Sequence, residues 1–179
     1  MDIKNLSLKY LAIFISDHLR KNGVETVLTG GACVSIYTDN KYISYDLDFV
    51  LLSTDDQKKA RSALEKIGFY EDDRYFKHKE TEFFVDFVSP PLSVGSEPVK
   101  DISEIKKDDR VLKLLSPTDC VKDRLAAFYH WDDKQALDQA LLVSMDNPVD
   151  FREIKRWSNN ERMIEKYRIY QKNIKKQRV

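Results

Sequence analysis

Two aspartates separated by one residue offer the most specific chemistry in this sequence. Asp46 and Asp48 lie in Asp46–Leu52, a segment rich in strand-forming residues. Because side chains alternate between the faces of a strand, both carboxylates should share one face while Leu47 and Phe49 point toward the core. Like charges this close are unfavourable without a cation, and Mg²⁺ prefers carboxylate oxygens. The pair predicts a metal site; the alternative is a solvated strand face that carries acids for solubility.

A third aspartate stands among apolar residues. Asp86 lies within Phe83–Val88, where an unpartnered charge is costly to desolvate. It could sit on a partly exposed strand face, or form a buried ion pair with a nearby Lys or Arg. If its strand lies beside Asp46–Leu52, three carboxylates meet. Such a cluster could hold two Mg²⁺ ions, one on a triphosphate and one that lowers the pKa of an attacking hydroxyl.

A glycine pair precedes these acids. Gly30 and Gly31 follow the predicted strand Glu25–Thr29 and open a helical stretch, Ala32–Tyr37. Backbone N–H groups and the positive end of a helix dipole would then face an anion, and the Ser35 hydroxyl could add to them. A plain turn is the alternative. The order of glycines and acids favours phosphate binding.

Taken together, Gly30–Ser35, Tyr45–Val50 and Val85–Phe87 resemble the nucleotidyltransferase superfamily related to DNA polymerase β. The signature of that superfamily is an apolar strand, Gly-Gly or Gly-Ser, a short gap, and Asp-x-Asp or Asp-x-Glu. The Gly-Gly-x-x-x-Ser form and the segment Leu115–Asp119 look most similar to small bacterial and archaeal members, which include the nucleotidyltransferase toxins of abortive-infection toxin–antitoxin systems. The resemblance covers about residues 25 to 145.

The resemblance implies a set of roles. The phosphates of an NTP substrate would be bound by Gly30, Gly31 and Ser35, the metals by Asp46 and Asp48, with Asp86 as the third metal-binding and catalytic carboxylate. It also implies Mg²⁺ or Mn²⁺ as cofactor, pyrophosphate as product, and a cognate antitoxin as partner. The interval between Gly31 and Asp46 is slightly longer than the commonest pattern.

The second half of the chain matches the family less closely. Pro117, Asp119 and Arg124-Leu125 fit a Pro-x-Asp segment followed by a basic residue before Leu. The later Lys-Asp-x-x-Asp-like segment keeps Asp138 but has Gln135 in place of the first acid. The resemblance adds three nucleotide-binding candidates: Lys122, Arg124 and Asp138. A surface charge on a helix is the alternative for Arg124, whose guanidinium suits phosphate oxygens.

The remaining elements predict an α/β (α+β) fold, in which a small mixed sheet carries packed helices and a helical region follows. Residues 1–115 should form the catalytic core and residues 116–179 a helical region packed on it. The expected elements are helices at Leu8–Leu19 and after Thr54, a hairpin of Tyr70–Lys77 and Glu82–Val88, a polar loop from Pro90 to Asp109, an apolar segment Val111–Leu115, and helices after Ser116, around Leu137 and after Asp150.

Charge is balanced overall but uneven along the chain. The 179 residues hold 30 Lys+Arg and 30 Asp+Glu, whereas Phe151–Val179 holds ten Lys/Arg against three Asp/Glu. This basic tail suggests RNA, particularly a tRNA end, as acceptor, and leaves a protein hydroxyl, a small molecule or a plain solvated helix open. A non-catalytic nucleotide- or RNA-binding module with this fold is the main alternative function.

The two cysteines and the N-terminus bear on location. Cys33 and Cys120 lack paired or metal-ligand spacing, which favours free thiols in a reducing compartment. Charged residues interrupt Met1–Leu19, so a signal peptide is not indicated, and no apolar run approaches a membrane span. We therefore expect a cytoplasmic protein without a membrane partner.

Overall fold

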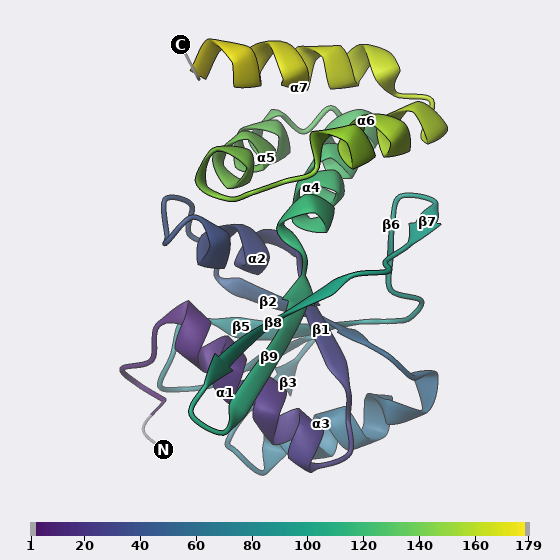
Figure 1. Ribbon diagram of the computed structural model, residues 1–179. Helices are drawn as coiled ribbons and strands as arrows, with labels where there is room; N and C mark the ends of the chain where they lie inside the picture. The colour runs from purple at the N-terminus through teal and green to yellow at the C-terminus, as the bar shows by residue number, and fades with distance from the viewer. Residues whose placement is uncertain (1–2, 178–179) are drawn as a thin grey trace.

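The computed structural model describes residues 3–177 and shows a sheet-containing half followed by stacked helices (Figure 1). In chain order the elements are α1 (Leu8–Lys21), β1 (Thr26–Thr29), α2 (Gly30–Tyr37), β2 (Asp46–Leu51), the 3₁₀ turn η1 (Thr54–Asp56), α3 (Gln57–Glu65), β3 (Tyr70–Asp72), β4 (Tyr75–Lys77), β5 (Phe84–Val88), β6 (Ser93–Val94), β7 (Glu97–Pro98), β8 (Ile102–Lys107), β9 (Arg110–Leu115), α4 (Pro117–Trp131), α5 (Lys134–Asp146), α6 (Phe151–Asn160) and α7 (Ile164–Gln177). The predicted mixed α/β fold class is confirmed.

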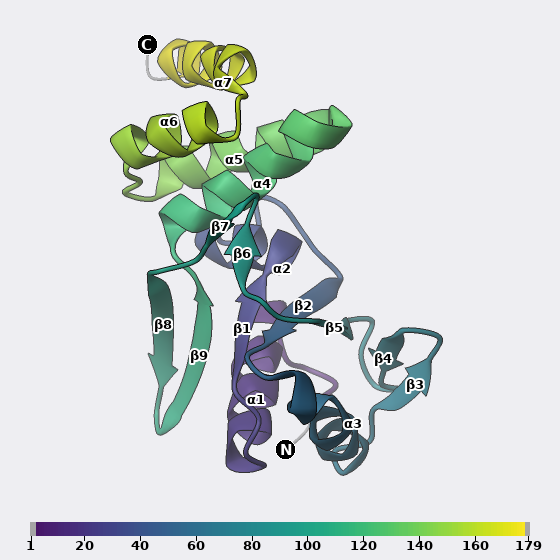
Figure 2. The same cartoon turned by 90° about the vertical axis from the view of Figure 1, so that its right-hand side faces the viewer.

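The main sheet is mixed and places β2 at its centre. Its seven strands run in the order β3-β4-β5-β2-β1-β9-β8. β2 pairs antiparallel with β1 and parallel with β5, and β1 pairs parallel with β9. The hairpins β3–β4 and β8–β9 form opposite edges (Figure 2). The strand that carries the aspartate pair thus has a neighbour on each side.

Helix α1 follows its predicted periodicity. Leu8, Leu11, Ile15 and Leu19 recur at helical spacing and are all buried, so they form the face that packs onto the sheet. The helix ends at Lys21, and Gly23 then adopts a φ of 76°, a left-handed conformation that glycine enters without steric cost.

The prediction of a polar loop from Pro90 to Asp109 is wrong. This stretch contains β8, which pairs only with β9, in a register that sets Ile102 opposite Leu115 and Lys107 opposite Arg110. An edge strand with both faces largely exposed needs no apolar alternation, and charged side chains protect its free edge. The sequence therefore lacked the period-two signal on which the prediction depended.

The predicted strand Tyr70–Lys77 is interrupted. A turn at residues 73–74 divides it into β3 and β4, with Asp73 at a φ of 58°. Aspartate tolerates this left-handed conformation because its short side chain can bond locally. The predicted pairing of this segment with the following strand is confirmed for β4, which runs antiparallel to β5.

The second half begins at the predicted capping residues. The Ser116 side chain accepts a hydrogen bond from the Asp119 backbone N–H at the start of α4, with Pro117 in the first helical position. Asp150 accepts two backbone N–H bonds at the start of α6. Trp157 and Tyr170 are fully buried and belong to the same hydrophobic cluster as the sheet residues. The helices therefore pack against the sheet half through one continuous core.

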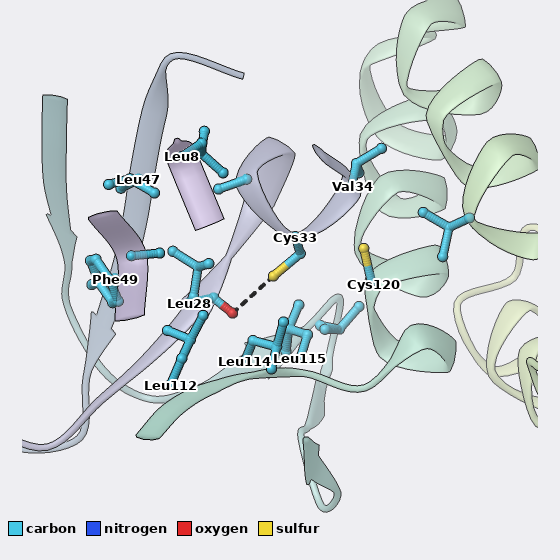
Figure 3. Close-up of a cluster of buried hydrophobic side chains, with 14 of the residues drawn as sticks. Leu8, Leu28, Cys33, Val34, Leu47, Phe49, Leu112, Leu114, Leu115 and Cys120 are labelled. Carbon is cyan, nitrogen blue, oxygen red and sulfur yellow. Dashed lines mark hydrogen bonds between the residues drawn. The ribbon is translucent and has the colours of Figure 1, made fainter. Parts of the chain in front are cut away.

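Both cysteines lie in that core (Figure 3). They are free and buried, and the Cys33 thiol donates to the Leu28 carbonyl at 3.1 Å. Cys33 lies on α2 and Cys120 on α4, so they help to pack the glycine-bearing helix against the helical half. Within residues 3–177, none of the helices combines the length and apolar character needed to cross a membrane.

Candidate active site

The three predicted aspartates lie on adjacent strands. β2 and β5 run parallel with Asp48 directly opposite Asp86, so these side chains project from the same face of the sheet. Along β2, Asp46 and Asp48 are half-buried while Leu47 and Phe49 are fully buried. The alternation predicted for β2 is therefore present. The register of β5, which the sequence left open, brings the third carboxylate to the other two.

The glycines place the start of α2 against one of these carboxylates. Gly30 has a φ of 69°, and a Cβ on it would lie 2.2 Å from the Asp48 Oδ2 atom. A Cβ on Gly31 would lie 2.9 Å from the Ser44 Oγ atom. Only a residue without a side chain permits this approach, which leaves backbone N–H groups near the carboxylates.

Ser35 has a positioning role in this geometry. Its buried hydroxyl accepts a hydrogen bond from the Ser44 backbone N–H at 2.8 Å and donates to the Gly31 carbonyl at 3.3 Å. Ser44 in turn donates from its hydroxyl to an Asp46 carboxylate oxygen. Ser35 thus links the glycine turn to the segment that presents Asp46. Its predicted direct contact with phosphate stays a prediction.

The environment of Asp48 raises the pKa of its carboxyl group. Burial raises its pKa to about 7, and the negative charges of Asp46 and Asp86 add to the rise, while Arg124 opposes it. Its carboxylate forms no hydrogen bond or ion pair with any side chain among residues 3–177. The site is therefore short of positive charge where Gly30 meets Asp48.

Asp86 has an ion-pair partner, as one alternative from the sequence allowed. The Arg74 Nη2 atom lies 2.8 Å from the Asp86 Oδ2 atom. Arg74 belongs to the turn between β3 and β4, and Tyr75 stands opposite Asp86 in the β4–β5 register. The β3–β4 hairpin therefore places the Arg74 guanidinium beside the third carboxylate.

Arg124 is the predicted helical-half residue whose charge acts on the cluster. It lowers the pKa of Asp48, and it is held by Asp123 at 2.5 Å and by Gln139 at 3.4 Å. Asp138 is exposed on α5, whereas the adjacent Gln139 is buried and contacts Arg124. Gln139 is therefore the residue of this pair that contacts Arg124, and the nucleotide contact of Asp138 stays a prediction.

Lys122 belongs to a different cluster. Its buried ammonium pairs with Asp119 at 2.8 Å and with Glu153 at 3.1 Å. These residues line a cavity of about 740 Å³ whose lining includes none of the three aspartates. For Lys122 to bind a triphosphate, it would have to leave two ion pairs. Its nucleotide contact stays a prediction.

Solved structures share this arrangement of strands and helices. An antigenic nucleotidyltransferase-like protein from Paracoccidioides brasiliensis is 12% identical, with a TM-score of 0.59 over 76% of this chain and 74% of that chain. ANT(2'')-Ia in complex with adenylyl-2''-tobramycin is 10% identical, with a TM-score of 0.54 over 87% and 96%. The solution structure of the same antibiotic-resistance factor is 12% identical, with a TM-score of 0.52 over 99% and 98%.

The chain has the nucleotidyltransferase fold. The fold that the resemblance in the glycine and aspartate segments implied is thereby confirmed. No family model matches the sequence, and no curated protein matches it. The toxin branch stays a prediction from those segments alone.

The donor atoms of this nucleotidyltransferase fold suit a hard divalent cation, although they are not gathered around one point. Among residues 3–177, no three His, Cys, Asp or Glu side chains already form a metal-binding group. The Ser44 hydroxyl engages Asp46 and the Arg74 guanidinium engages Asp86, so two of the three carboxylates face other partners. Three carboxylates on one face, one of them without a partner, are the oxygen donors that Mg²⁺ and Mn²⁺ prefer.

Sequence reasoning missed four side chains around the three carboxylates. Ser44 precedes Asp46 by two residues, so strand alternation could have placed it on the same face. Arg74 follows Asp72-Asp73, a turn signal within an apparent strand. The other two, Asp123 and Gln139, reach the site only through tertiary packing, which no local pattern reveals.

Proposed function

We propose that this protein is a metal-dependent nucleotidyltransferase that transfers a nucleotide from an NTP to an acceptor hydroxyl. The observation that carries the proposal is the parallel register that sets Asp48 opposite Asp86, beside the glycine start of α2. The acceptor oxygen bonds to the α-phosphorus while the bond from that phosphorus to the β-phosphate oxygen breaks. Pyrophosphate leaves and the acceptor proton is taken up by a carboxylate.

Each residue has a distinct part in this proposal. Asp46 and Asp48 hold Mg²⁺ or Mn²⁺, which would neutralise the triphosphate and activate the attacking hydroxyl. Asp86 completes the set and accepts the proton from the acceptor. The backbone N–H groups at Gly30 and Gly31 bind phosphate oxygens, with Ser35 fixing their position. Arg124, close enough to affect Asp48, supplies positive charge to the nucleotide.

The acceptor is proposed to be RNA, particularly a tRNA end, because α7 exposes a basic face. Arg168, Lys172, Lys175 and Lys176 are exposed and line a shallow pocket of about 390 Å³. Phosphate backbones are recognised mainly by such charge. A toxin activity, with a cognate antitoxin as partner, extends this proposal by resemblance alone. A small-molecule hydroxyl is the second candidate, since a neighbour in fold was solved with adenylyl-2''-tobramycin.

The reaction class is tested by the position of the label. The full chain is incubated with α-³²P- or γ-³²P-labelled NTPs, with Mg²⁺ or Mn²⁺, and with total RNA, total protein or a pool of small hydroxyl compounds. Nucleotidyl transfer predicts acceptor labelling from the α-labelled NTP alone. Labelling from the γ-labelled NTP would show phosphoryl transfer instead and would contradict the proposal.

A non-catalytic nucleotide- or RNA-binding module is the alternative, and two features favour it. Two of the three carboxylates are engaged, Asp46 by Ser44 and Asp86 by Arg74, and Lys122 is neutralised by two acids. Such a module would bind RNA equally well after Asp46→Ala and would label no acceptor. The enzyme proposal predicts instead that Asp46→Ala abolishes labelling.

A further inference from the structure

The Arg74–Asp86 ion pair joins an exposed arginine side chain to a mostly buried aspartate. The Arg74 side chain is 66% exposed and the Asp86 side chain 12% exposed, with 2.8 Å between Nη2 and Oδ2. Surface ion pairs between two exposed side chains contribute little to stability. Here one partner is a carboxylate of the proposed site, so the pair bears on chemistry rather than on folding alone.

The hairpin orients the Arg74 side chain without burying it. The Arg74 Cζ atom lies 4.8 Å from the centroid of the Tyr75 ring, a cation–π contact. Tyr75 is in turn paired with Asp86 across the strands and packs edge-on against Phe84, with ring centroids 4.9 Å apart. The ring therefore helps to hold the guanidinium beside Asp86, and because the Arg74 side chain is 66% exposed it can turn into solvent without disturbing the core.

Arg74 also lies in the field of the whole cluster. The charge of Asp86 raises the pKa of Arg74 most strongly, Tyr75 adds to it, and Asp48 contributes in the same direction. Among residues 3–177, Arg74 is the one basic residue that forms an ion pair with any of the three aspartates. It supplies the positive charge that three neighbouring carboxylates require.

We propose that Arg74 and the catalytic metal ion are alternative counter-ions of Asp86. Arg74 forms an ion pair with the Asp86 carboxylate while the metal is absent, and this ion pair breaks when the metal binds. The inference rests on the proposed function, because it assumes that Asp86 belongs to the metal-binding set. It makes Arg74 a positioning residue: its guanidinium determines where the Asp86 carboxylate points, and therefore how tightly the metal binds.

The geometry supports exchange rather than simultaneous binding. The Asp86 Oδ2 atom is taken by Arg74, and the three carboxylates are not arranged as a metal-binding group in this state. A divalent cation beside the guanidinium would also repel it, because both charges would share a partly buried face. Rotation of the exposed Arg74 side chain away from Asp86 is the smallest movement that makes the Asp86 carboxylate available to the metal.

The test is the affinity of the full chain for Mn²⁺ alone, measured by the electron paramagnetic resonance of free Mn²⁺ in titrations without NTP. Because Arg74→Ala removes the competitor, it should tighten Mn²⁺ binding by about 2- to 5-fold, as expected for loss of a partly exposed ion pair. Arg74→Lys, which restores the charge, should return the affinity toward that of the wild type. Arg74→Gln keeps a polar arm without charge and should behave as Arg74→Ala.

The matched control is Lys77→Ala. Lys77 lies on the same hairpin and pairs with Asp72 at 2.6 Å, so its removal lowers the positive charge equally. Mn²⁺ affinity should not change in this variant. Unchanged or weaker binding in both Arg74→Ala and Arg74→Gln would overturn the exchange, as would an equal gain in Lys77→Ala. Because no nucleotide is present, failure of the exchange is distinguishable from failure of nucleotidyl transfer.

Discussion

Asp48 has the least compensated charge of the three aspartates. The Ser44 hydroxyl donates a hydrogen bond to Asp46, and the Arg74 guanidinium forms an ion pair with Asp86. Asp48 has neither contact with a side chain among residues 3–177, and only the more distant charge of Arg124 favours its ionised form. Burial and the two neighbouring carboxylates raise its pKa to about 7. A carboxylate with this pKa ionises near neutral pH only at a cost to the fold, unless a cation binds.

The pH dependence of unfolding should reveal this cost. A raised folded-state pKa gives stability that is complete below the unfolded pKa and is lost as pH rises through the folded pKa, so the loss should fall between about pH 4 and 7. With EDTA present, we expect Asp48→Asn to become more stable than the wild type by on the order of 4 kcal/mol at pH 8 and to match it near pH 4. Urea unfolding at each pH measures the difference.

Asp55→Asn provides the control for this experiment. Asp55 is an exposed acid on the 3₁₀ turn before α3, so Asp55→Asn removes one carboxylate outside the cluster and is the comparison at each pH. A constant difference between Asp48→Asn and the wild type from pH 4 to 8 would refute the raised pKa.

At the residue scale, local spacing predicted part of the site. Asp46 and Asp48 could be placed together because the period of a strand is two, and that period is a property of the backbone. The position of Asp86 opposite Asp48, and of Arg74 against Asp86, depends on which strands pair and in what register. Register is set by contacts distant in sequence, so the sequence could only offer an ion pair or a cluster as alternatives.

At the element scale, the segment between α2 and β2 decides how the carboxylates are presented. Ser35 fixes its end near Ser44, and Lys41 pairs with Asp146 of α5 at 2.7 Å. The Asn147 side-chain amide donates to the Tyr37 carbonyl at 2.8 Å. These contacts tie the start of the strand that carries the aspartates to the helical half.

Removing the hydroxyl that anchors this segment should destabilise the protein. Ser35→Ala leaves the buried Ser44 N–H without an acceptor, which costs about 1–3 kcal/mol. The same variant should lower transfer activity, because Ser44, which donates a hydrogen bond to Asp46, would no longer be held in place by Ser35. Denaturant unfolding gives the first quantity and α-label transfer the second.

Ser62→Ala is the matched change at an exposed position on α3. It should alter the free energy of unfolding by less than about 0.5 kcal/mol. Equal effects of the two substitutions would contradict the anchoring role of Ser35.

Elements with strong local signals were predicted, and those without them were not. The apolar face of α1 and the caps Ser116 and Asp150 gave correct helix positions, because periodicity and capping act within a few residues. β8 was missed because an exposed edge strand needs no buried face. The turn at Arg74 was missed because aromatic residues on both sides of Asp72-Asp73 favoured one continuous strand.

At the scale of the whole molecule, the helical half borders the candidate site and exposes a basic surface. α4 and α5 supply Arg124 and Gln139 beside the sheet, while α7 lies on the far side of the stacked helices (Figure 1). On α7, Tyr167, Tyr170 and Ile174 are buried, while Lys172, Lys175 and Lys176 are exposed. The division into a core of residues 1–115 and a helical region stays a prediction, since one hydrophobic cluster joins them.

Charge reversal on α7 tests RNA as the acceptor. Lys172→Glu/Lys175→Glu/Lys176→Glu should weaken RNA binding by at least about tenfold at low salt and reduce the slope of log K against log salt by about 2. The control reverses three charges elsewhere, in Lys58→Glu/Lys59→Glu/Lys66→Glu at α3. Filter binding over a salt series measures both. Equal losses in the two variants would assign RNA binding to net charge and contradict a docking face on α7.

The central claim is that the three aspartates catalyse nucleotidyl transfer. Its most direct test is the initial rate of α-³²P transfer to the acceptor by the wild type and by Asp46→Asn, Asp48→Asn and Asp86→Asn, each shown to be folded. We predict that each substitution lowers the rate by at least about a hundredfold, because each removes a carboxylate charge that helps to stabilise the transition state. Wild-type rates in all three variants, or no transfer by the wild type to any acceptor, would contradict the claim.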